Sequence, residues 1–592
     1  MAQISFSSTP NLVLRLPMWR SRLVLFLMFV GFVALVIRAM WVQGFGNSFY
    51  EEKGNKATLR SIEMPASRGK ILDRNGEVLA TSLLAKAIIA FPDAIPDDLP
   101  KEKVSELAKL LEMPEAEVRK RMRSERNQVF LKRQVDLEVA KQIRQLGIPG
   151  IAQNNEYRRL YPEGEAMAHI VGFTNVEDKG QEGMELAREK DLVGQPGRRR
   201  VIQDRLGRYV ENLGIISPPR DGADLQLSID SKVQFLAYNE IKAVAEKHNA
   251  KGAGAVVLDV HTGEILALAN YPSYNPNSRQ NLSGEQLRNR VLTDTFEPGS
   301  TMKPFPISLA LEKGLVQPNT QMAIGKSLVV GKKAITDTHP YGSLTVAEVV
   351  QKSSNIGTVK MAMQLEAQEM WELFQALGFG QAPEIGFPGA VAGRLRPYKN
   401  WVPIDQATMS YGYGLSASLF QVARAYSIFA RDGELVSTTI YKTDQSPKGV
   451  RVISAKTAIQ MREMLEMVTQ TGGTATGAQT MGYRVGGKTG TAHKVEGRGY
   501  AGNKYRGFFV GMAPMSAPRI VVAVMVDEPR SGGYYGGIVA APAFSNIVAG
   551  TLRNMNVLPD AAIKQMVDQE FKSQNIKPAA LTGGNNKVAT TQ

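Results

Sequence analysis

The sequence is poor in two residue types on which enzymes often rely. It has no cysteine among 592 residues, which excludes disulfide bonds and is compatible with an oxidising compartment without proving one. It has only five histidines, and they show neither an H-E-x-x-H pair nor the spacing of a catalytic triad. We therefore predict no metal and no cofactor, and we interpret His493 as structural. No repeat period is present either.

Long hydrophobic runs are scarce, with one exception near the N-terminus. The run LVLFLMFVGFVALVIRAMWV, from Leu23 to Val42, carries a single charge, Arg38, near enough to its end to reach lipid headgroups. The alternative is a cleaved signal peptide. Against it, the run is longer than a usual signal-peptide core, and bulky Trp41 and Val42 stand where cleavage needs small residues. The run therefore predicts an uncleaved transmembrane anchor over residues 23–42.

Acidic residues are missing from the first 22 positions, which contain Arg15, Arg20 and Arg22. The positive-inside rule then predicts that residues 1–22 form a cytoplasmic tail and that the chain after residue 43 lies outside the cytoplasm. On an exported chain, the net charge of +15 indicates anionic lipids or cell-wall polymers as partners rather than nucleic acid. The densest basic cluster, Gly197–Arg208, has no ladder of stacking aromatic residues, and we interpret it as a solvated face.

Composition divides the exported part into two domains. Residues 43–223 are mixed and charged, and the Asn75-Gly76 turn indicates a short β-hairpin there. The prolines and glycines of SPPRDGADLQLSID (Ser217–Asp230) place the boundary near residue 223. The second domain, 224–565, alternates strands with helices.

Three features describe the rest of the chain. An apolar hairpin turns at His261-Thr262-Gly263, and the region after it is rich in helices. Near the end, no helix-length segment separates RGFFVGMAP (Arg506–Pro514) from IVVAVMVDE (Ile520–Glu528), which favours an antiparallel meander. The tail, residues 566–592, is polar and poor in aromatic residues, so we predict that it is disordered.

The stretch GYRVGGKTGTAHK, from Gly482 to Lys494, fits two incompatible motifs. It satisfies G-x-x-x-x-G-K-[ST], the loop that binds nucleotide phosphates, and its Lys488-Thr489-Gly490 is also the K-T-G of penicillin-reactive serine acyltransferases. A phosphate loop needs an apolar strand before it and a helix directly after it. Neither neighbouring sequence has that character, because TGGTATGAQTM precedes it and a glycine-rich stretch follows. The context excludes nucleotide binding and favours acyl transfer.

An acyltransferase of this kind needs S-x-x-K, then S-x-N, then K-[ST]-G along the chain. S-x-x-K occurs at Ser300–Lys303 and at Ser67–Lys70, and the second pair is explained by a surface loop beside the hairpin. Between Ser300 and the single K-T-G at Lys488, S-x-N occurs only at Ser353-Ser354-Asn355. The order of the three motifs therefore selects one set of residues.

The residue types explain the chemistry of this set. Ser300 appears at the start of a helix, so Lys303, three residues on, can reach its hydroxyl and remove the proton if burial and nearby cations lower the lysine pKa. Backbone amides of Ser300 and Thr491 would form the oxyanion hole. Ser353 would pass a proton to the leaving amine, and Asn355 would hold the substrate amide.

The third motif would bind the end of the substrate. Lys488 supplies positive potential, and Thr489 and Thr491 can bind a terminal carboxylate. Gly490 lets the substrate lie close against the strand edge. A second proline, Pro306, follows Pro304 and should kink the helix after Ser300 or shift its start.

These three motifs resemble those of penicillin-binding proteins. The anchor and RGKILDRNG (Arg68–Gly76) resemble class B, the monofunctional D,D-transpeptidases. YRRLYPEGEAMAHIVGFTN (Tyr157–Asn175), DKGQEGMEL and DEPRSGGYYGGIVAAPAF (Asp527–Phe544) resemble the division-specific FtsI family, and the resemblance extends from about residue 20 to about residue 560.

The resemblance implies an α+β fold. It implies a single transmembrane helix, a pedestal or dimerisation domain, and a β-lactamase-like transpeptidase domain with a five-stranded antiparallel sheet flanked by helices. The implied reaction cross-links peptidoglycan stem peptides ending in D-Ala-D-Ala, through a serine acyl-enzyme with release of D-Ala, and makes the chain a β-lactam target. The implied partners are an FtsW-type septal glycosyltransferase and other division proteins. The implied location is the inner membrane at the septum, with a periplasmic catalytic domain.

Other interpretations remain open at this point. An elongation-type class B transpeptidase would share the motifs, as would a β-lactamase. The β-lactamase would also need a deacylating glutamate, and the sequence has no E-x-x-L-N. A catalytically silent β-lactam sensor or division scaffold is the alternative from another class of protein, although every motif position holds the expected residue.

Overall fold

The computed structural model describes residues 18–45, 52, 59–203, 209–278, 280, 282–496 and 499–562. The chain divides into two compact units that interleave along the sequence. The first unit comprises residues 1–65, 87–155 and 196–220, and the second comprises 66–86, 156–195 and 221–592. Most of the predicted cytoplasmic tail and all of the predicted disordered tail, 566–592, lie outside the described residues.

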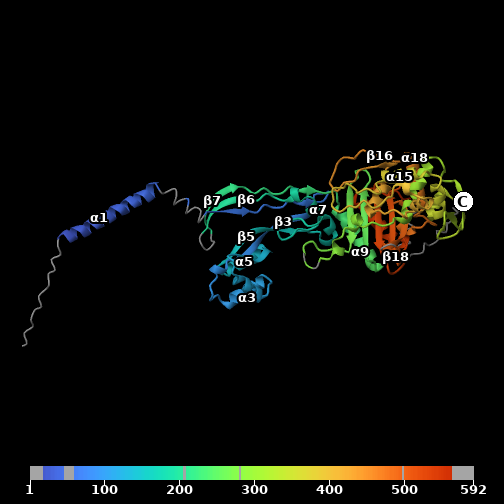
Figure 1. Ribbon diagram of the computed structural model, residues 1–592. Coiled ribbons are helices and arrows are strands. Elements are labelled where there is room, and N and C mark those ends of the chain that lie inside the picture. The colour runs from blue at the N-terminus through green and yellow to red at the C-terminus, as the bar shows by residue number, and fades with distance from the viewer. Residues whose placement is uncertain are drawn as a thin grey trace, which may run out of the picture. The chain divides into compact units, whose positions relative to one another are not determined.

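A long apolar helix, α1 (Met18–Met40), begins the described chain and continues into one π-helical turn, η1 (Trp41–Phe45) (Figure 1). The most apolar 18-residue stretch within Met18–Gln43 has a mean hydropathy of 2.6, and none of it is buried within the chain. At a rise of about 1.5 Å per residue, these residues extend over about 39 Å, more than the hydrocarbon core of a bilayer. The predicted anchor, 23–42, lies within a helix that is long and apolar enough to cross a membrane.

The rest of the first unit consists of a three-stranded sheet and a small helical part. The helical part has its own core, which includes Val104, Leu107 and Leu111. The elements are the sheet strands β1 (Leu59–Met64), β6 (Gly197–Gln203) and β7 (Tyr209–Ser217), and then α3 (Lys101–Leu110), α4 (Glu115–Met122), β4 (Val129–Val135) and α5 (Leu137–Gln145).

The second unit begins with the hairpin predicted at Asn75-Gly76. Strand β2 (Ile71–Leu72) pairs antiparallel with the start of β3 (Val78–Ala90), and Gly76 has a φ of 90°, which a residue with a side chain rarely adopts. A buried ion cluster holds this hairpin: Glu185 accepts from Arg68 Nε at 2.5 Å and from Arg159 Nε at 2.7 Å. Further elements follow: β5 (Ile151–Leu160), α6 (Ala168–Val171), α7 (Gly183–Ala187), α8 (Glu189–Leu192) and β8 (Leu225–Gln226).

A five-stranded antiparallel sheet forms the centre of the second unit, as predicted. Its strand order is β10-β9-β19-β18-β17, with β10 (Ile265–Tyr271), β9 (Gly252–Asp259), β19 (Ile520–Asp527), β18 (Gly499–Ala513) and β17 (Gly486–Glu496). The predicted hairpin at Gly263 and the predicted terminal meander are both present.

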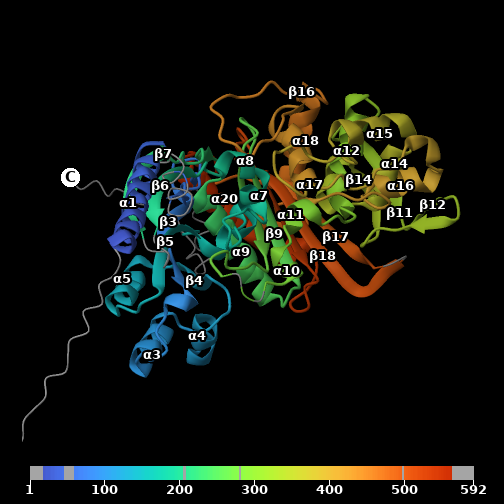
Figure 2. The ribbon, with the colours of Figure 1, turned by 60° about the vertical axis from the view of Figure 1, so that its left-hand side comes forward.

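Helices cover both faces of this sheet (Figure 2). Helices α9 (Ser231–Lys247) and α20 (Ala541–Asn554) pack together on one face, and α17 (Leu419–Ala430) and α18 (Ala455–Met467) lie on the other. Every residue of β9 and of β19 is buried, which explains their continuous apolar sequences. Strand β17 stands at the edge of the sheet.

A helical region between β10 and β17 packs around an aromatic core. Phe305 stacks on Phe429 and meets Phe379 and Tyr426 edge to face, with centroids 5.5–5.9 Å apart. Apart from α17 and α18, its main elements are α10 (Gly284–Leu287), α11 (Arg290–Thr293), the 3-10 turn η4 (Gly299–Met302), α12 (Pro304–Glu312), α13 (Val346–Lys352), α14 (Asn355–Ala362), α15 (Ala367–Ala376) and α16 (Pro403–Ser410).

Short two-stranded ribbons join these helices: β11 (Gln321–Gly325) with β14 (Tyr341–Thr345), β12 (Leu328–Val330) with β13 (Lys333–Ile335), and β15 (Glu434–Leu435) with β16 (Val450–Arg451). Helices beside an antiparallel sheet confirm the predicted α+β class.

Candidate active site

Ser300 lies in the 3-10 turn η4, directly before α12, and not in the first turn of the α-helix as predicted. The two prolines explain the difference. Pro304 occupies the first position of α12 and Pro306 the third, where the missing N–H groups would have no partner within the helix. The helix start is therefore shifted past the serine, which was one of the two consequences expected of Pro306.

Lys303 connects this turn to the second motif. Its side chain is 1% exposed, and its Nζ donates to Ser353 O at 2.5 Å and to Ser353 Oγ at 3.0 Å. Burial lowers the pKa of Lys303 to about 7, and the negative charge of Asp337 opposes that shift. At neutral pH a large fraction of this amine is therefore uncharged and able to accept a proton.

The second motif is held between two helices. Ser353 ends α13 with a left-handed φ of 61°, and the neighbouring Ser354 begins α14 by accepting a hydrogen bond from Gly357 N. The strained backbone at Ser353 directs both its carbonyl and its hydroxyl to Lys303. Asn355 donates from Nδ2 to Thr336 O at 2.9 Å.

Asp337 is a residue of this site that sequence reasoning missed. Its Oδ2 accepts from Ser354 Oγ at 2.6 Å, and its Oδ1 accepts from the backbone amides of Asn355 at 2.5 Å and Ile356 at 3.1 Å. It thus caps the N-terminus of α14 from a loop 17 residues earlier in the chain. Only its position after the short ribbon strand β13 could have drawn attention to it, because no local pattern links it to α14.

The third motif lies on the edge strand β17. Lys488 is fully buried, and burial together with the charge of Lys303 lowers its pKa well below the usual value. Thr489 shares a hydrogen bond of 2.9 Å with Thr474, and Thr491 Oγ1 accepts from Gly536 N at 3.2 Å. The two lysines therefore influence each other electrostatically, which places the first and third motifs in one site.

Close packing brings the serine turn against β17. A Cβ added at Gly490 would lie 2.8 Å from Thr301 Cγ2 and 3.1 Å from Pro298 O, so only glycine fits there. Gly299, next to Ser300, has a φ of 57°, and a Cβ on it would lie 3.3 Å from Thr491 O. The structure thus brings together Ser300 with Thr491, and Lys303 with Ser353 and Lys488.

The predicted hydrogen bond between Ser300 and Lys303 is absent. Among the described residues, Ser300 Oγ has no hydrogen-bond partner, and Lys303 is bonded to Ser353 in its place. Hydrogen bonds between nucleophile and base are often made only when substrate is present, so this arrangement does not remove Ser300 from consideration.

The structure also argues against a nucleotide-binding loop at Gly482–Thr489. Lys488 and Thr489 lie inside β17, which begins at Gly486 and continues to Glu496, so no helix opens after the glycine-rich stretch. The second S-x-x-K pair is peripheral, as expected: Lys70 is exposed, and Ser67 N donates to Asp221. His493 is exposed and lies against Tyr505, with ring centroids 4.5 Å apart.

Glu297, three residues before Ser300, organises the rim of the site, and sequence reasoning missed this role. Its carboxylate accepts from Gly414 N at 2.9 Å and from Tyr500 OH at 3.1 Å. Tyr413 lies beside Tyr500, with centroids 6.3 Å apart. Burial and the charge of Glu297 raise the pKa of Tyr500, so this phenol remains protonated at physiological pH.

The arrangement can perform acyl transfer at a serine. It combines an accessible serine, a buried amine with a pKa near 7, a hydroxyl that bonds that amine, and an open strand edge beside a buried cation. In the described part of the chain, no group of three or more His, Asp or Glu side chains could hold a metal ion.

Comparison with known proteins agrees with this chemistry. Residues 253–549 match the penicillin binding protein transpeptidase domain, and residues 63–227 match the penicillin-binding protein dimerisation domain. The probable peptidoglycan D,D-transpeptidase PenA of Neisseria gonorrhoeae is 41% identical, over 91% of this chain and 93% of that protein. The peptidoglycan D,D-transpeptidase FtsI of Escherichia coli K12 is 37% identical, over 92% of this chain and 93% of that protein.

A solved structure gives the same result for the fold. The apo transpeptidase domain of penicillin-binding protein 3 from Burkholderia pseudomallei is 56% identical and superimposes with a TM-score of 0.53, covering 57% of this chain and 98% of that one.

Proposed function

Because this chain belongs to the class B penicillin-binding proteins, we propose that it is a serine D,D-transpeptidase that cross-links peptidoglycan stem peptides during septal wall synthesis. The observation that carries the proposal is Lys303. Its amine is buried, has a pKa near 7, and lies between the serine turn and Ser353. Among the described residues its only hydrogen-bond partners are the carbonyl and the hydroxyl of Ser353, and a large fraction of the amine is uncharged at neutral pH, which fits a general base.

The reaction then runs in two steps. Lys303 Nζ takes the proton of Ser300 Oγ, and that oxygen attacks the carbonyl carbon of the penultimate D-Ala. The backbone amides of Ser300 and Thr491 bind the oxyanion of the tetrahedral intermediate. As the C–N bond breaks, the proton passes from Lys303 through Ser353 to the leaving amine, and D-Ala departs, leaving an ester on Ser300.

The second step reverses these proton transfers. The amine of a neighbouring stem peptide attacks the ester, Lys303 and Ser353 receive its proton, and Ser300 leaves as the alcohol. A carboxylate bound by Thr489 and Thr491 would favour the charged form of Lys488, which then provides positive potential for it. The absence of an E-x-x-L-N deacylating glutamate separates the proposed activity from that of a β-lactamase.

The location and partners follow the same proposal. The anchor α1 would hold the chain in the inner membrane with the catalytic unit in the periplasm. At the septum, we propose that it works with an FtsW-type glycosyltransferase and other division proteins, since a cross-linking enzyme needs newly made glycan strands as substrate. The domain boundaries near residues 43, 223 and 565 belong to the same proposal.

The activity can be tested with a thioester donor that mimics D-Ala-D-Ala and a D-amino acid as acceptor. We expect the detergent-solubilised full chain to form both the hydrolysis product and the transfer product, and Ser300→Ala to form neither. The matched control is Ser67→Ala, which alters the other S-x-x-K serine and should keep full activity. A chain that binds β-lactam but never turns over the donor would be a silent sensor, and the proposal would be wrong.

A further inference from the structure

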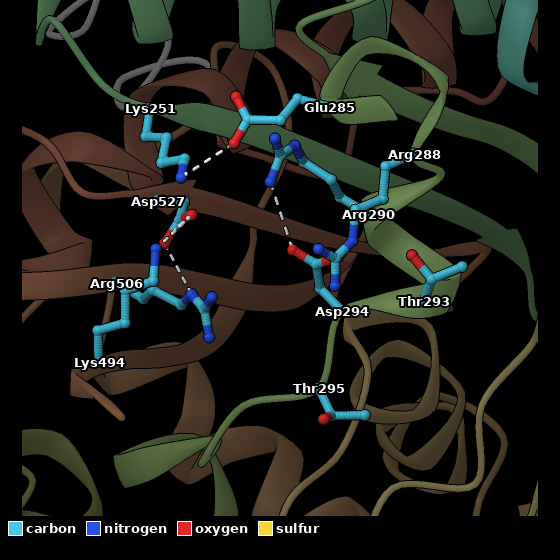
Figure 3. Close-up of a pocket in the computed structure, with 10 residues that line it drawn as sticks. All are labelled: Lys251, Glu285, Arg288, Arg290, Thr293, Asp294, Thr295, Lys494, Arg506 and Asp527. Carbon is cyan, nitrogen blue, oxygen red and sulfur yellow. Dashed lines mark hydrogen bonds and ion pairs between the residues drawn. The ribbon is translucent and has the colours of Figure 1, made fainter. Parts of the chain in front are cut away.

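A basic pocket lies on the sheet next to the proposed active site, and we propose that it binds a carboxylate carried by the donor stem peptide, on the N-terminal side of the D-Ala that is acylated. The inference rests on the proposed function. The pocket has a volume of about 280 Å³, and its cationic residues are Lys251, Arg288, Arg290, Lys494 and Arg506 (Figure 3). We call this set the basic pocket.

The charge of the basic pocket is unbalanced. Its lining contains five cationic and only three acidic side chains, so the carboxylates must be shared. Asp294 pairs with both Arg288 and Arg290, and Asp527 pairs with both Lys494 and Arg506. Glu528 also pairs with Lys494 from outside the lining, and one positive charge still remains in excess. An excess of cations around a cavity favours an anionic ligand.

One of these cations also has an unused donor. Arg290 is 3% exposed, and its Nε has no hydrogen-bond partner among the described residues. Its only ion pair within the described part of the chain is a long one, 3.5 Å from Nη1 to Asp294 Oδ2. The close-up shows its guanidinium between Glu285 and Asp294, among the charged groups that line the cavity (Figure 3). A buried donor without a partner is costly, and an incoming oxygen would satisfy it.

The position of the basic pocket indicates which part of the donor peptide would reach it. If the terminal carboxylate is bound at Thr489 and the acylated carbonyl lies at Thr491, the donor peptide runs along β17 in the direction of increasing residue number. Its residues before the D-Ala therefore pass toward Lys494, three positions beyond Thr491 and about 10 Å further along the strand. Lys494 lies at an irregularity of β17 between His493 and Val495, where its side chain pairs with Asp527 and lines the basic pocket.

The basic pocket and Ser300 are also joined by a short stretch of chain. Thr293 and Thr295 line the basic pocket, and Ser300 follows only five residues after Thr295. Phe296 between them stacks on Phe508 and contacts the Arg506 guanidinium, 5.7 Å from its ring centroid. The small volume suits one charged group at the end of a side chain and not a whole disaccharide. These features favour a peptide carboxylate over a larger anion.

The test compares two thioester donors that differ in one group. Both end in the same D-Ala thioester, and one carries a free carboxylate on the residues before it where the other carries the carboxamide. For the wild-type full chain we expect kcat/KM to favour the carboxylate by about tenfold, the effect of one charge-assisted hydrogen bond, and to lose this preference at high salt.

Exposed members of the basic pocket are the best variants, because Arg290→Gln could fail to fold. Arg288→Gln and Lys251→Gln should each reduce the preference several-fold, whereas Glu285→Gln, which removes a negative charge, should increase it. The matched control is Arg451→Gln: like Arg288 it is 52% exposed and pairs with a carboxylate, here Glu434, but it lies in β16. The control should keep the wild-type preference.

The opposite effects of Arg288→Gln and Glu285→Gln distinguish ligand binding from a structural role, which would lower activity with both donors. Equal kcat/KM for the two donors in an active wild-type chain would overturn the inference and leave the proposed function standing. Failure of both donors together with failure of β-lactam acylation would instead overturn the proposed function. A preference that appears only with a lipid-phosphate donor would assign the pocket to phosphate and contradict the peptide carboxylate.

Discussion

At the scale of single residues, the site depends on an amine that is kept out of water. Lys303 and Lys488 are both fully buried, and each burial makes the protonated form unfavourable. Lys488 has no carboxylate partner among the described residues, whereas Asp337 acts on Lys303 from a distance. Asp337 opposes the shift at Lys303, whose pKa is about 7, whereas the charge of Lys303 adds to the lowering of the Lys488 pKa. The sequence predicted both lysines in the site, but it gave no sign of the burial that lowers the pKa of each.

The pH dependence of acylation tests this assignment. The neutral fraction of Lys303 increases as pH rises through about 7, so the second-order rate of β-lactam acylation should increase between pH 6 and pH 8 and then level off. Stopped-flow measurements on the full chain would give the profile. A rate that is flat across this range, with Ser300 still acylated, would mean that another group serves as the base.

The free energy of unfolding should also depend on the titration of Lys303. Between about pH 7 and pH 10.5, Lys303 carries a proton in the unfolded chain but not in the folded chain. The free energy of unfolding therefore rises with pH across this window. Lys303→Met removes the titration while filling the space. We expect this variant to lose acylation, to be more stable than the wild type at pH 7, and to lose that advantage as pH approaches 10. Thermal unfolding at several pH values measures it, and an advantage that grows with pH would contradict the account.

At the scale of elements, the site is built where helices and strands begin or end. Ser300 precedes α12, Ser353 ends α13, and Asn355 begins α14. Asp337 fixes the last two by capping α14. Ser353 and Asn355 are therefore placed by backbone that cannot shift without breaking this cap.

Removal of that cap provides a prediction at this scale. Asp337→Ala leaves the amides of Asn355 and Ile356 without their acceptor, and should lower the free energy of unfolding by about 1–2 kcal/mol. It should also slow acylation, because Ser353 and Asn355 lose their fixed positions. Asp337→Asn, which keeps one acceptor oxygen, should recover much of the stability. Denaturant unfolding and acylation rates of both variants are the measurements, and full activity in the alanine variant would show that the cap does not position the site.

The elements also show what sequence could and could not predict. The central hairpin, the terminal meander and the absence of a phosphate loop were predictable, because glycine turns, apolar runs and the lack of a following helix are local features. The 3-10 turn at Ser300 was not placed correctly, since two prolines moved the helix start. Asp337 and Glu297 were missed because their partners lie 17 and 117 or more residues away, and spacing in sequence does not report such contacts.

At the scale of the whole molecule, one apolar helix begins the first of two units, and the proposed site lies entirely in the second. The three site motifs span almost 190 residues, from Ser300 to Lys488, and meet through the packing of the serine turn against β17. Sequence order identified them because each motif has a fixed place in the chain. The basic pocket was not predicted, since its five cations come from four separate segments.

The septal role is a prediction about the cell. If the chain cross-links the septum, its depletion should give long filaments with separated nucleoids, because elongation continues while division stops. Complementation with the wild-type chain should restore division, and Ser300→Ala should not. Microscopy decides between the alternatives: swollen, round cells that still divide would assign the chain to elongation.

The central claim is that Ser300 is the acylated nucleophile of a site shared with Lys303 and Lys488. It is tested most directly by incubating the full chain with a β-lactam and locating the adduct by peptide mass spectrometry. The account predicts one stoichiometric adduct at Ser300, its loss in Ser300→Ala and almost complete loss in Lys303→Ala, and slower formation at the same residue in Lys488→Ala. An adduct on another residue, or no adduct together with saturable ATP binding, would contradict it.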